Sequence, residues 1–333
     1  GLGLAQIYMA RPRGGWDRGV GTLASWTLGI NNHRMYYRAC GDSRSDQHRQ
    51  VASCLCRVAA DLAASVGPEV LAAVQYGAES EDLLANRSLL DHLRSLTVGT
   101  GTRAIIHHPD GSTPGTPGFV QSLLSSLRRG KYLGSDWVVV HAPTGDSDDV
   151  FDVACSELTD ESIVRQVRRS GVGVAVENRG PSRHGVPFGR IDVLASLVSR
   201  MREACAEGGV EGTSARMGIC LDYGHLLAYE GTSGRGTSGI RRLLGGWSEL
   251  VTVAHIHNND GSGDQHLLLG ERPEGVPASV LIEHESILLE TIIPSLIHCR
   301  SYVIERNSPY EREGLEACAH KLAQAIESGA HLS

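Results

Sequence analysis

Long amphipathic stretches alternate with short apolar runs along the chain from about residue 47 onward. The stretch 46–66 carries its apolar residues at helical spacing, and the run 70–76 that follows it is short and apolar. Such an alternation is typical of parallel β/α units. The pattern predicts strands at residues 24–30, 70–76, 103–107, 137–141, 173–177, 218–222, 251–257 and 302–305. It predicts helices at residues 46–66, 81–96, 119–131, 160–169, 191–207, 240–247, 279–296 and 310–327.

Eight strands that are each followed by a helix predict an α/β protein with a closed (β/α)8 barrel, the TIM-barrel fold. The barrel is expected to cover residues 24–330 as a single domain, with residues 1–23 as an N-terminal arm. The strands are short and mostly apolar, as expected where both faces of a sheet are covered. A doubly wound open sheet is the alternative, but such a sheet usually carries a glycine-rich phosphate turn after its first strand, and none follows Ile30.

Composition restricts the partners of the protein more than its fold. The 333 residues are 41% hydrophobic and 21% charged, which excludes a disordered, collagen-like or coiled-coil chain. A net charge of -7 argues against a broad basic face for nucleic acid or an anionic membrane, so a small-molecule substrate is the expected partner. The eight cysteines include no CxxC pair, which indicates reduced thiols in a cytoplasmic protein, and no apolar run approaches the roughly 20 residues that span a bilayer. By analogy with other barrel proteins, a homodimer is a further expectation.

Polar residues stand at the ends of six consecutive predicted strands. The C-terminal ends of the strands line the active-site mouth of such barrels, so side chains there are candidates for chemistry. The residues in question are His107 and His108, His141, Glu177, Asp222 with the nearby His225, His255 with His257 and Asp260, and Glu305; Asp264 and His266 follow in the next loop. A single residue of this kind is most often a helix cap or a core residue whose hydrogen bonds are satisfied. That explanation does not account for polar residues at the ends of six consecutive strands.

Carboxylates and imidazoles gathered in one cavity predict a bound cation. Burying several of these groups together is costly unless something neutralises them, and a divalent ion is the natural partner. Imidazole and carboxylate ligands without thiolate suit Zn, Mn, Co or Fe, whereas an all-oxygen set would favour Mg or Ca. The sequence therefore predicts a divalent metal cofactor.

The motifs VENR, LDYGH, HIHNND and VIERN resemble the metal-binding strand ends of the xylose-isomerase-like TIM barrel superfamily. This superfamily includes sugar isomerases and epimerases and the endonuclease IV-type apurinic endonucleases, and the resemblance covers about residues 100–310. It implies that one metal ion is held, as in the isomerases and epimerases, by Glu177, Asp222, His257 and Glu305. His257 is preferred to His255 because the family pattern places the ligand a few residues before an acid, here Asp260.

The same resemblance also implies a larger cluster. The residues that match the additional ligands of the endonuclease IV group, in which three zinc ions hydrolyse a phosphodiester, are His107, His141, His225, Asp264 and His266. One departure counts against a nucleic-acid substrate: Asp110 follows the HHP motif where the endonucleases continue to an aromatic residue, and an acid at a phosphate-facing rim is repulsive. The early loops also lack a cluster of Arg, Lys and aromatic residues.

The first functional hypothesis is a sugar or polyol isomerase or epimerase. In it, the metal ion binds a carbonyl and an adjacent hydroxyl and stabilises the enediolate that forms when a C–H proton leaves. Glu177 and Glu305 are the expected catalytic acid/base pair, on opposite faces of the substrate carbon, and His225 is expected to orient a substrate oxygen.

Three further residues are candidate substrate contacts. Arg179 follows Glu177 by two residues and could reach a hydroxyl or phosphate, although a surface salt bridge explains it equally well. His184 lies in the loop after the fifth predicted strand, where specificity often resides, and His33 follows the first. Gln75 ends the second predicted strand, where a loop hydrogen bond is the simpler interpretation.

Three alternatives to the isomerase stay open. The first is an endonuclease IV-like phosphodiester hydrolase with two or three ions, the second a metal-dependent lyase or oxidative enzyme acting on a small molecule, and the third a non-catalytic barrel. The metal content of the protein separates the isomerase from the hydrolase, because about one equivalent of metal favours the isomerase and two or three equivalents favour the hydrolase cluster.

Overall fold

The chain folds into a closed parallel barrel in a computed structural model that describes residues 26–32, 44–77, 87–144, 149–180, 187–207, 212–232, 240, 246–306 and 312–330. The strands are β1 (Trp26–Asn32), β2 (Val70–Gly77), β3 (Arg103–His107), β4 (Trp137–His141), β5 (Gly173–Glu177), β6 (Met217–Asp222), β7 (Val251–Ile256) and β8 (Ser301–Ile304). Each pairs in parallel with the next along the chain, and β8 pairs with β1. The predicted (β/α)8 barrel is thereby confirmed.

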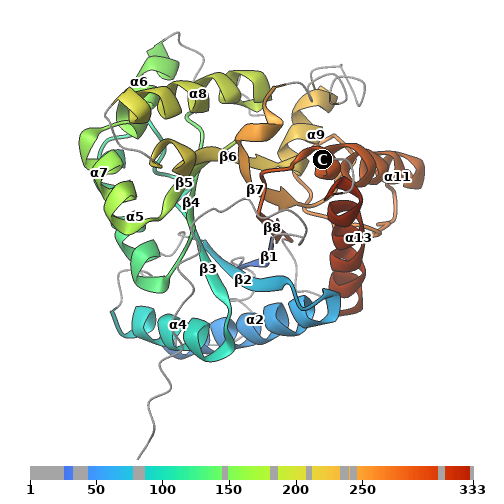
Figure 1. The fold of residues 1–333 in the computed structure, drawn as a ribbon. Helices are drawn as coiled ribbons and strands as arrows, with labels where there is room; N and C mark the ends of the chain where they lie inside the picture. The colour runs from blue at the N-terminus through green and yellow to red at the C-terminus, as the bar shows by residue number, and fades with distance from the viewer. Residues whose placement is uncertain are drawn as a thin grey trace, which may run out of the picture.

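Helices surround the barrel on its outside (Figure 1). They are α2 (Arg44–Val66), α4 (Arg87–Thr100), α5 (Phe119–Leu133), α6 (Asp149–Leu158), α7 (Glu161–Ser170), α8 (Ile191–Glu207), α9 (Tyr223–Thr232), α11 (Ala278–Ile287), α12 (Ile293–Ser295) and α13 (Arg312–Ala330). A π-helical segment, η4 (Leu288–Ile292), joins α11 to α12, and short 3-10 turns are η1 (Pro187–Gly189), η2 (Ser214–Arg216) and η3 (Ser248–Leu250).

Two helices, α6 and α9, are present where the hydrophobic pattern predicted none. The helix predicted at 240–247 falls mostly outside the described residues, as do the N-terminal arm at 1–23, His33 and His184.

Helix boundaries follow ordinary local chemistry where they are described. The Asp160 side chain accepts a hydrogen bond from the backbone N–H of Ser162 and caps α7, and Gly171, with φ of 73°, ends that helix in the left-handed region.

Side chains of the strands alternate between the helices outside and the barrel interior. The outward set packs with the helices into one large apolar core. The inward set forms a separate apolar layer of small and branched residues, which are Ala73, Ile105, Val139, Ala175, Cys220, Val253 and Val303. This layer closes the barrel interior, so a site can open only above it, toward the C-terminal ends of the strands.

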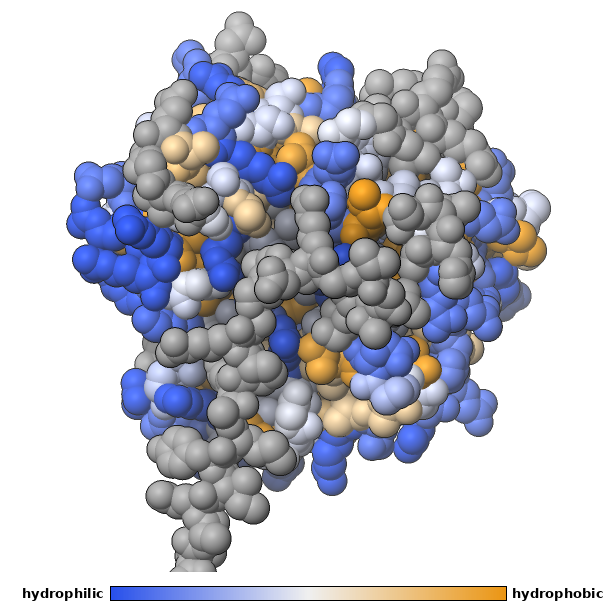
Figure 2. Space-filling model, viewed as in Figure 1, coloured by the Kyte–Doolittle hydropathy of each residue, from blue (hydrophilic) through white to orange (hydrophobic). Residues whose placement is uncertain are grey.

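On the face of the molecule drawn in Figure 2, the described residues at the rim are mostly hydrophilic, with apolar side chains scattered among them. Among the described residues, the large exposed hydrophobic side chains are Val98, Val153, Ile282 and Ile297. Within that same part of the chain, no helix has both the length and the apolar character needed to cross a bilayer. The seven cysteines that the structure describes form no disulfide.

Candidate metal centre

Eight polar side chains form a ring directly above the apolar layer. Each lies two residues further along its strand than an inward-facing small or apolar residue, so strand alternation turns it to the same interior. We call this set the interior ring; its members are Asn31, Gln75, His107, His141, Glu177, Asp222, His255 and Glu305. Residues far apart in the sequence therefore meet at one level of the barrel.

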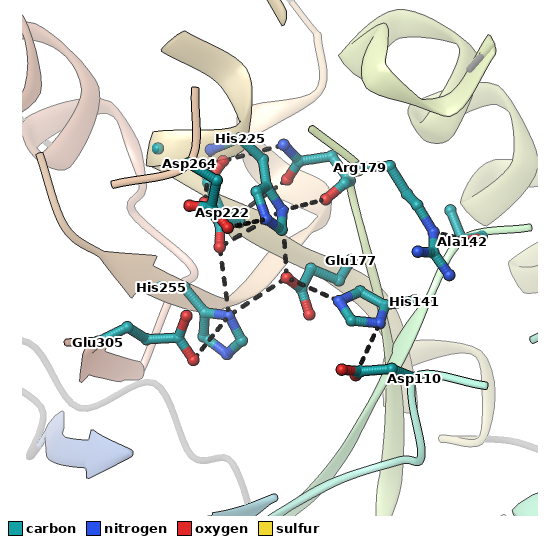
Figure 3. A network of polar contacts seen from close by, with 12 residues as sticks. Asp110, His141, Ala142, Glu177, Arg179, Asp222, His225, His255, Asp264 and Glu305 are labelled. Atoms are coloured by element: carbon teal, nitrogen blue, oxygen red, sulfur yellow. Dashed lines mark hydrogen bonds and ion pairs between the residues drawn. The ribbon is translucent and has the colours of Figure 1, made fainter. Parts of the chain in front are cut away.

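Glu177 lies among the ring residues of β3, β4 and β5 and is 1% exposed. Its Oε2 lies 2.9 Å from His107 Nε2, and its Oε1 lies 3.4 Å from His141 Nε2. The Nδ1 of His107 donates to the carbonyl oxygen of His108 at 2.9 Å, which turns Nε2 toward the pocket. Asp110, which the sequence placed at the rim, contacts His141 Nδ1 at 3.2 Å. Figure 3 shows Glu177, His141 and Asp110 on one side of the pocket.

Asp222 ends β6 and begins α9. Its Oδ1 accepts from the backbone N–H of His225 at 2.7 Å and contacts His257 Nε2 at 2.9 Å, so it caps the helix while facing the pocket. The side chain of Asn178 holds the backbone of Asp222 on both sides. The Asn178 Nδ2 donates to the carbonyl oxygen of Asp222 at 2.9 Å, and the Asn178 Oδ1 accepts from the backbone N–H of Asp222 at 2.7 Å. The His225 Nδ1 donates to Asn178 O, and Nε2 faces Asp264 Oδ2 at 3.3 Å.

His257 lies two residues beyond His255, nearer the mouth, against Gly224. A Cβ built on Gly224 would lie 1.7 Å from His257 Cε1, so only glycine leaves room for this imidazole. The His257 ring stacks on His266 with centroids 4.2 Å apart. His266 in turn contacts Asp264 at 3.1 Å and Glu305 at 3.4 Å. All of the metal ligands expected from the sequence therefore line this pocket.

His255 also lies in the pocket, although the sequence motif favoured His257 over it. Its Nδ1 is 3.5 Å from Glu177 Oε1, 3.4 Å from Glu305 Oε1 and 3.8 Å from Asp222 Oδ2 (Figure 3). The signal that finds it is the alternation along β7, because Val253 faces the barrel interior and the residue two positions later must do the same.

Charges of opposite sign shift the pKa values of these groups strongly. Burial lowers the pKa of His141, but the Glu177 and Asp110 carboxylates together outweigh burial and raise the pKa to about 9. Burial also lowers the pKa of His225, but Asp222, Asp264 and Glu177 together raise it to about 10. On the acid side, burial raises the pKa of Glu305, yet the neighbouring imidazoles bring it down to about 2. The pocket thus has a negative potential that attracts positive charge of any kind.

The donor set fits a divalent cation. Five groups of three described residues place a ligand atom each within 4.8 Å of one another. Four consist of histidines and carboxylates, and they are His107, His141 and Glu177; Glu177, Asp222 and His225; Asp222, His255 and Glu305; and His257, His266 and Glu305. The fifth joins Glu177 and His255 to Cys220, and burial raises the pKa of this thiol well above its usual value, so it stays protonated and is a poor ligand.

Four buried atoms of the pocket need a partner. Among the described residues, His141 Nδ1, His255 Nδ1, His257 Nδ1 and Asp222 Oδ2 are buried and have no hydrogen-bond partner. A buried polar atom without a partner costs free energy, and a bound cation would supply that partner.

Two other sequence candidates lie beside the pocket rather than in it. The Arg179 Nε donates to Ala142 O at 2.8 Å, and Figure 3 shows the guanidinium on the same side as His141. Burial lowers the pKa of Arg179, and Glu177 acts in the opposite direction. His108 points away from the pocket, where Ser126 Oγ lies 2.9 Å from its Nδ1 and Phe119 packs edge-on against its ring.

Several solved structures share this fold, whereas no protein-family model and no curated protein matches the sequence. A D-tagatose 3-epimerase-like protein is 20% identical with a TM-score of 0.54, over 78% of this chain and 90% of that chain. Endonuclease IV from Thermus thermophilus is 19% identical with a TM-score of 0.52, over 92% and 99%. The IOLI protein with a bound zinc atom is 11% identical with a TM-score of 0.53, over 91% and 96%. The chain therefore has the fold of the xylose-isomerase-like TIM barrels.

Proposed function

We propose that the protein is a metal-dependent phosphoester hydrolase that holds two or three divalent ions in the pocket above the apolar layer. The observation that carries the proposal is the group formed by His107, His141 and Glu177. A single ion bound by the Asp222, His255 and Glu305 group does not need the two histidines, yet both are aimed at Glu177.

Charge balance supports more than one ion. With the histidines bound as neutral ligands, the carboxylates of Glu177, Asp222, Glu305 and Asp264 carry four negative charges in the ligand groups and beside them, which is twice what one divalent ion neutralises. Glu177 belongs to several of the groups and offers a different oxygen to His107 and to His141, so it is suited to bridge neighbouring ions. The ions would activate a water for attack on phosphorus and stabilise the leaving oxygen.

The protein's own residues have distinct tasks in this proposal. Asp110 contacts His141 as an ion pair from outside the pocket, and Asn178 holds the backbone of Asp222 through two hydrogen bonds, so both candidate ligands are oriented by neighbours. Arg179 lies on the same side and supplies a partly buried positive charge for a phosphate oxygen. Asp110 limits the substrate, because a half-exposed acid near the entrance disfavours a long polyanion. We therefore expect a small phosphate ester rather than duplex nucleic acid.

Sugar isomerisation or epimerisation is the second candidate. The Glu177, Asp222, His255 and Glu305 set suffices for one ion, and the two glutamates come from β5 and the end of β8, on different sides of the pocket. One similar structure is an epimerase-like protein and another is an endonuclease by name, so the fold supports either chemistry.

His141→Ala separates the two candidates. In the hydrolase, loss of His141 removes a ligand from the Glu177 group, so we expect one metal equivalent fewer and at least about a 100-fold loss of phosphoester hydrolysis, in line with the cost of losing a metal-site residue. Metal content is measured by mass spectrometry, hydrolysis with bis-p-nitrophenyl phosphate, and epimerisation with D-tagatose and D-fructose.

The matched control is His320→Ala, since His320 is exposed on α13. It is expected to keep the metal content and the activity of the wild type. A wild-type protein that binds one equivalent, hydrolyses no phosphoester and epimerises a ketose would refute the hydrolase in favour of the second candidate.

A further inference from the structure

Gln75 lies in the interior ring between two of the candidate metal ligands. It is 2% exposed and comes from β2, on the far side of the barrel from β6. Its Nε2 lies 2.8 Å from Glu305 Oε1, and its Oε1 lies 2.9 Å from His255 Nε2. One amide therefore contacts a carboxylate with one end and an imidazole with the other.

The chemistry of these partners fixes which atom carries each proton. An ionised carboxylate can only accept, so the amide Nε2 of Gln75 must donate to Glu305. The amide oxygen then faces His255, and because an amide oxygen can only accept, the Nε2 of His255 must carry its hydrogen. In the neutral imidazole the other nitrogen, Nδ1, is left with a free lone pair.

That lone pair faces the carboxylates of the ring. The Nδ1 atom is buried, lies within 3.8 Å of oxygens of Glu177, Glu305 and Asp222, and has no hydrogen-bond partner among the described residues. Carboxylate oxygens this close to Nδ1 require positive charge there, which is either a proton on Nδ1 or a cation that takes the place of that proton.

We propose that Gln75 is a positioning residue of the metal centre, which fixes His255 in the Nε2–H tautomer and thereby presents Nδ1 to an ion held by the interior ring. Hydrogen bonds of this kind orient metal-binding histidines and raise their basicity. Gln75 also holds Glu305, so a single amide aligns two ligands of the same ion. The inference rests on the proposed function only in requiring a metal.

His257 has a different environment and serves a different group. Its Nε2 contacts Asp222 Oδ1 at 2.9 Å, and its ring stacks on His266, with which it shares a ligand group. The amide of Gln75 contacts His255 and not His257. The inner ion therefore takes His255, and His257 belongs to the ligands nearer the mouth.

Gln75→Leu tests the inference, because leucine has a similar size but neither donates nor accepts. The metal-free variant is titrated with zinc by calorimetry beside the wild type and Gln121→Leu, a control at an exposed glutamine of α5. We expect the variant to bind one zinc ion about 10 to 100 times more weakly and the control to bind as the wild type does. Unchanged zinc affinity in a folded Gln75→Leu protein would overturn the proposal.

A second measurement uses the wild type and does not depend on how the variant folds. Two-bond 1H–15N spectra of histidine-labelled, zinc-loaded protein report which nitrogen of each imidazole carries hydrogen, and His255→Gln assigns the relevant signals. We expect His255 to be protonated at Nε2 and bound to zinc through Nδ1. Zinc on Nε2 of His255, or on His257 alone in the inner group, would refute the inference.

The two proposals fail in distinguishable ways. Protein that binds zinc through His255 Nδ1 but hydrolyses no phosphoester would contradict the proposed function and leave the role of Gln75 intact. Protein that hydrolyses phosphoesters but binds zinc through His255 Nε2 would support the proposed function and contradict the role of Gln75.

Discussion

Gly224 is the residue at which the backbone approaches His257 most closely. An added methyl group would lie 1.7 Å from His257 Cε1, so Gly224→Ala must displace the imidazole or the first turn of α9. We expect a loss of about 1 to 3 kcal/mol in the free energy of unfolding, as in other overpacked sites, together with weaker zinc binding. Urea unfolding and zinc titration measure the two effects.

The control for this change is Gly99→Ala. Gly99 lies in α4 with open space where a Cβ would be, so alanine there should stabilise the protein by about 0.5 to 1 kcal/mol through helix propensity. Equal behaviour of the two alanine variants would show that the space beside His257 is not restricted in solution.

Single residues also mark how far the sequence alone could lead. The change from apolar to polar at the end of each strand is visible in the sequence, and it placed Glu177, Asp222 and Glu305 at one end of the barrel. Which of His255 and His257 lies level with them depends on the alternation along β7, where the residue two positions before His255 faces the interior. The role of Gln75 could not be predicted, because its partners lie 180 and 230 residues away in the sequence.

At the scale of elements, the hydrophobic pattern of the sequence predicts a helix best where one face of that helix is buried and the other is exposed. α9 was missed because most of its described residues are buried, so it has no polar face to give a helical period. This helix begins at the Asp222 cap and places His225 in its first turn, facing the pocket. The local chemistry of the LDYGH motif thus serves the helix and the metal centre together.

Glu285 connects two elements behind the pocket and gives the protein a dependence on pH. It lies in α11, where it pairs with Lys321 of α13 and accepts hydrogen bonds from Gly270 N at 2.8 Å and Arg272 at 3.1 Å. Burial raises the pKa of Glu285, but these partners outweigh it and hold the pKa below its usual value. A lowered acid pKa means that the stabilisation is complete above the unfolded value of about 4.3 and is lost as the pH falls through the folded value.

We therefore expect the stability difference between wild type and Glu285→Gln to be largest near neutral pH and to shrink below about pH 4. Urea unfolding with a chelator present, at several pH values, measures it without interference from metal. Glu290→Gln is the control, since Glu290 is exposed in η4, and its difference from wild type should stay small throughout. A Glu285→Gln difference that grows as the pH falls would contradict the expected direction.

Across the whole molecule, the barrel joins strands that are distant in the sequence, and its closure was predictable from the number of β/α units. That closure brings a ring of carboxylates to one level of the barrel interior, where Glu177, Asp222 and Glu305 are all buried. Their mutual repulsion is relieved only by protonated histidines or by cations, so the stability of the fold and the occupancy of the metal centre are coupled.

Removing metal should therefore destabilise the entire barrel and not only the strand ends. Each ion that binds the folded chain alone stabilises it by about 4 kcal/mol at a free concentration 1,000 times its dissociation constant, so zinc-loaded and chelator-treated proteins should unfold at clearly different midpoints. Thermal and urea unfolding, followed by circular dichroism, measure the difference. In Asp222→Asn the gap between the two conditions should narrow, because that residue belongs to two ligand groups. Superimposable wild-type curves with zinc and with chelator would mean that no cation holds these acids together, and both proposals would fall with the metal centre.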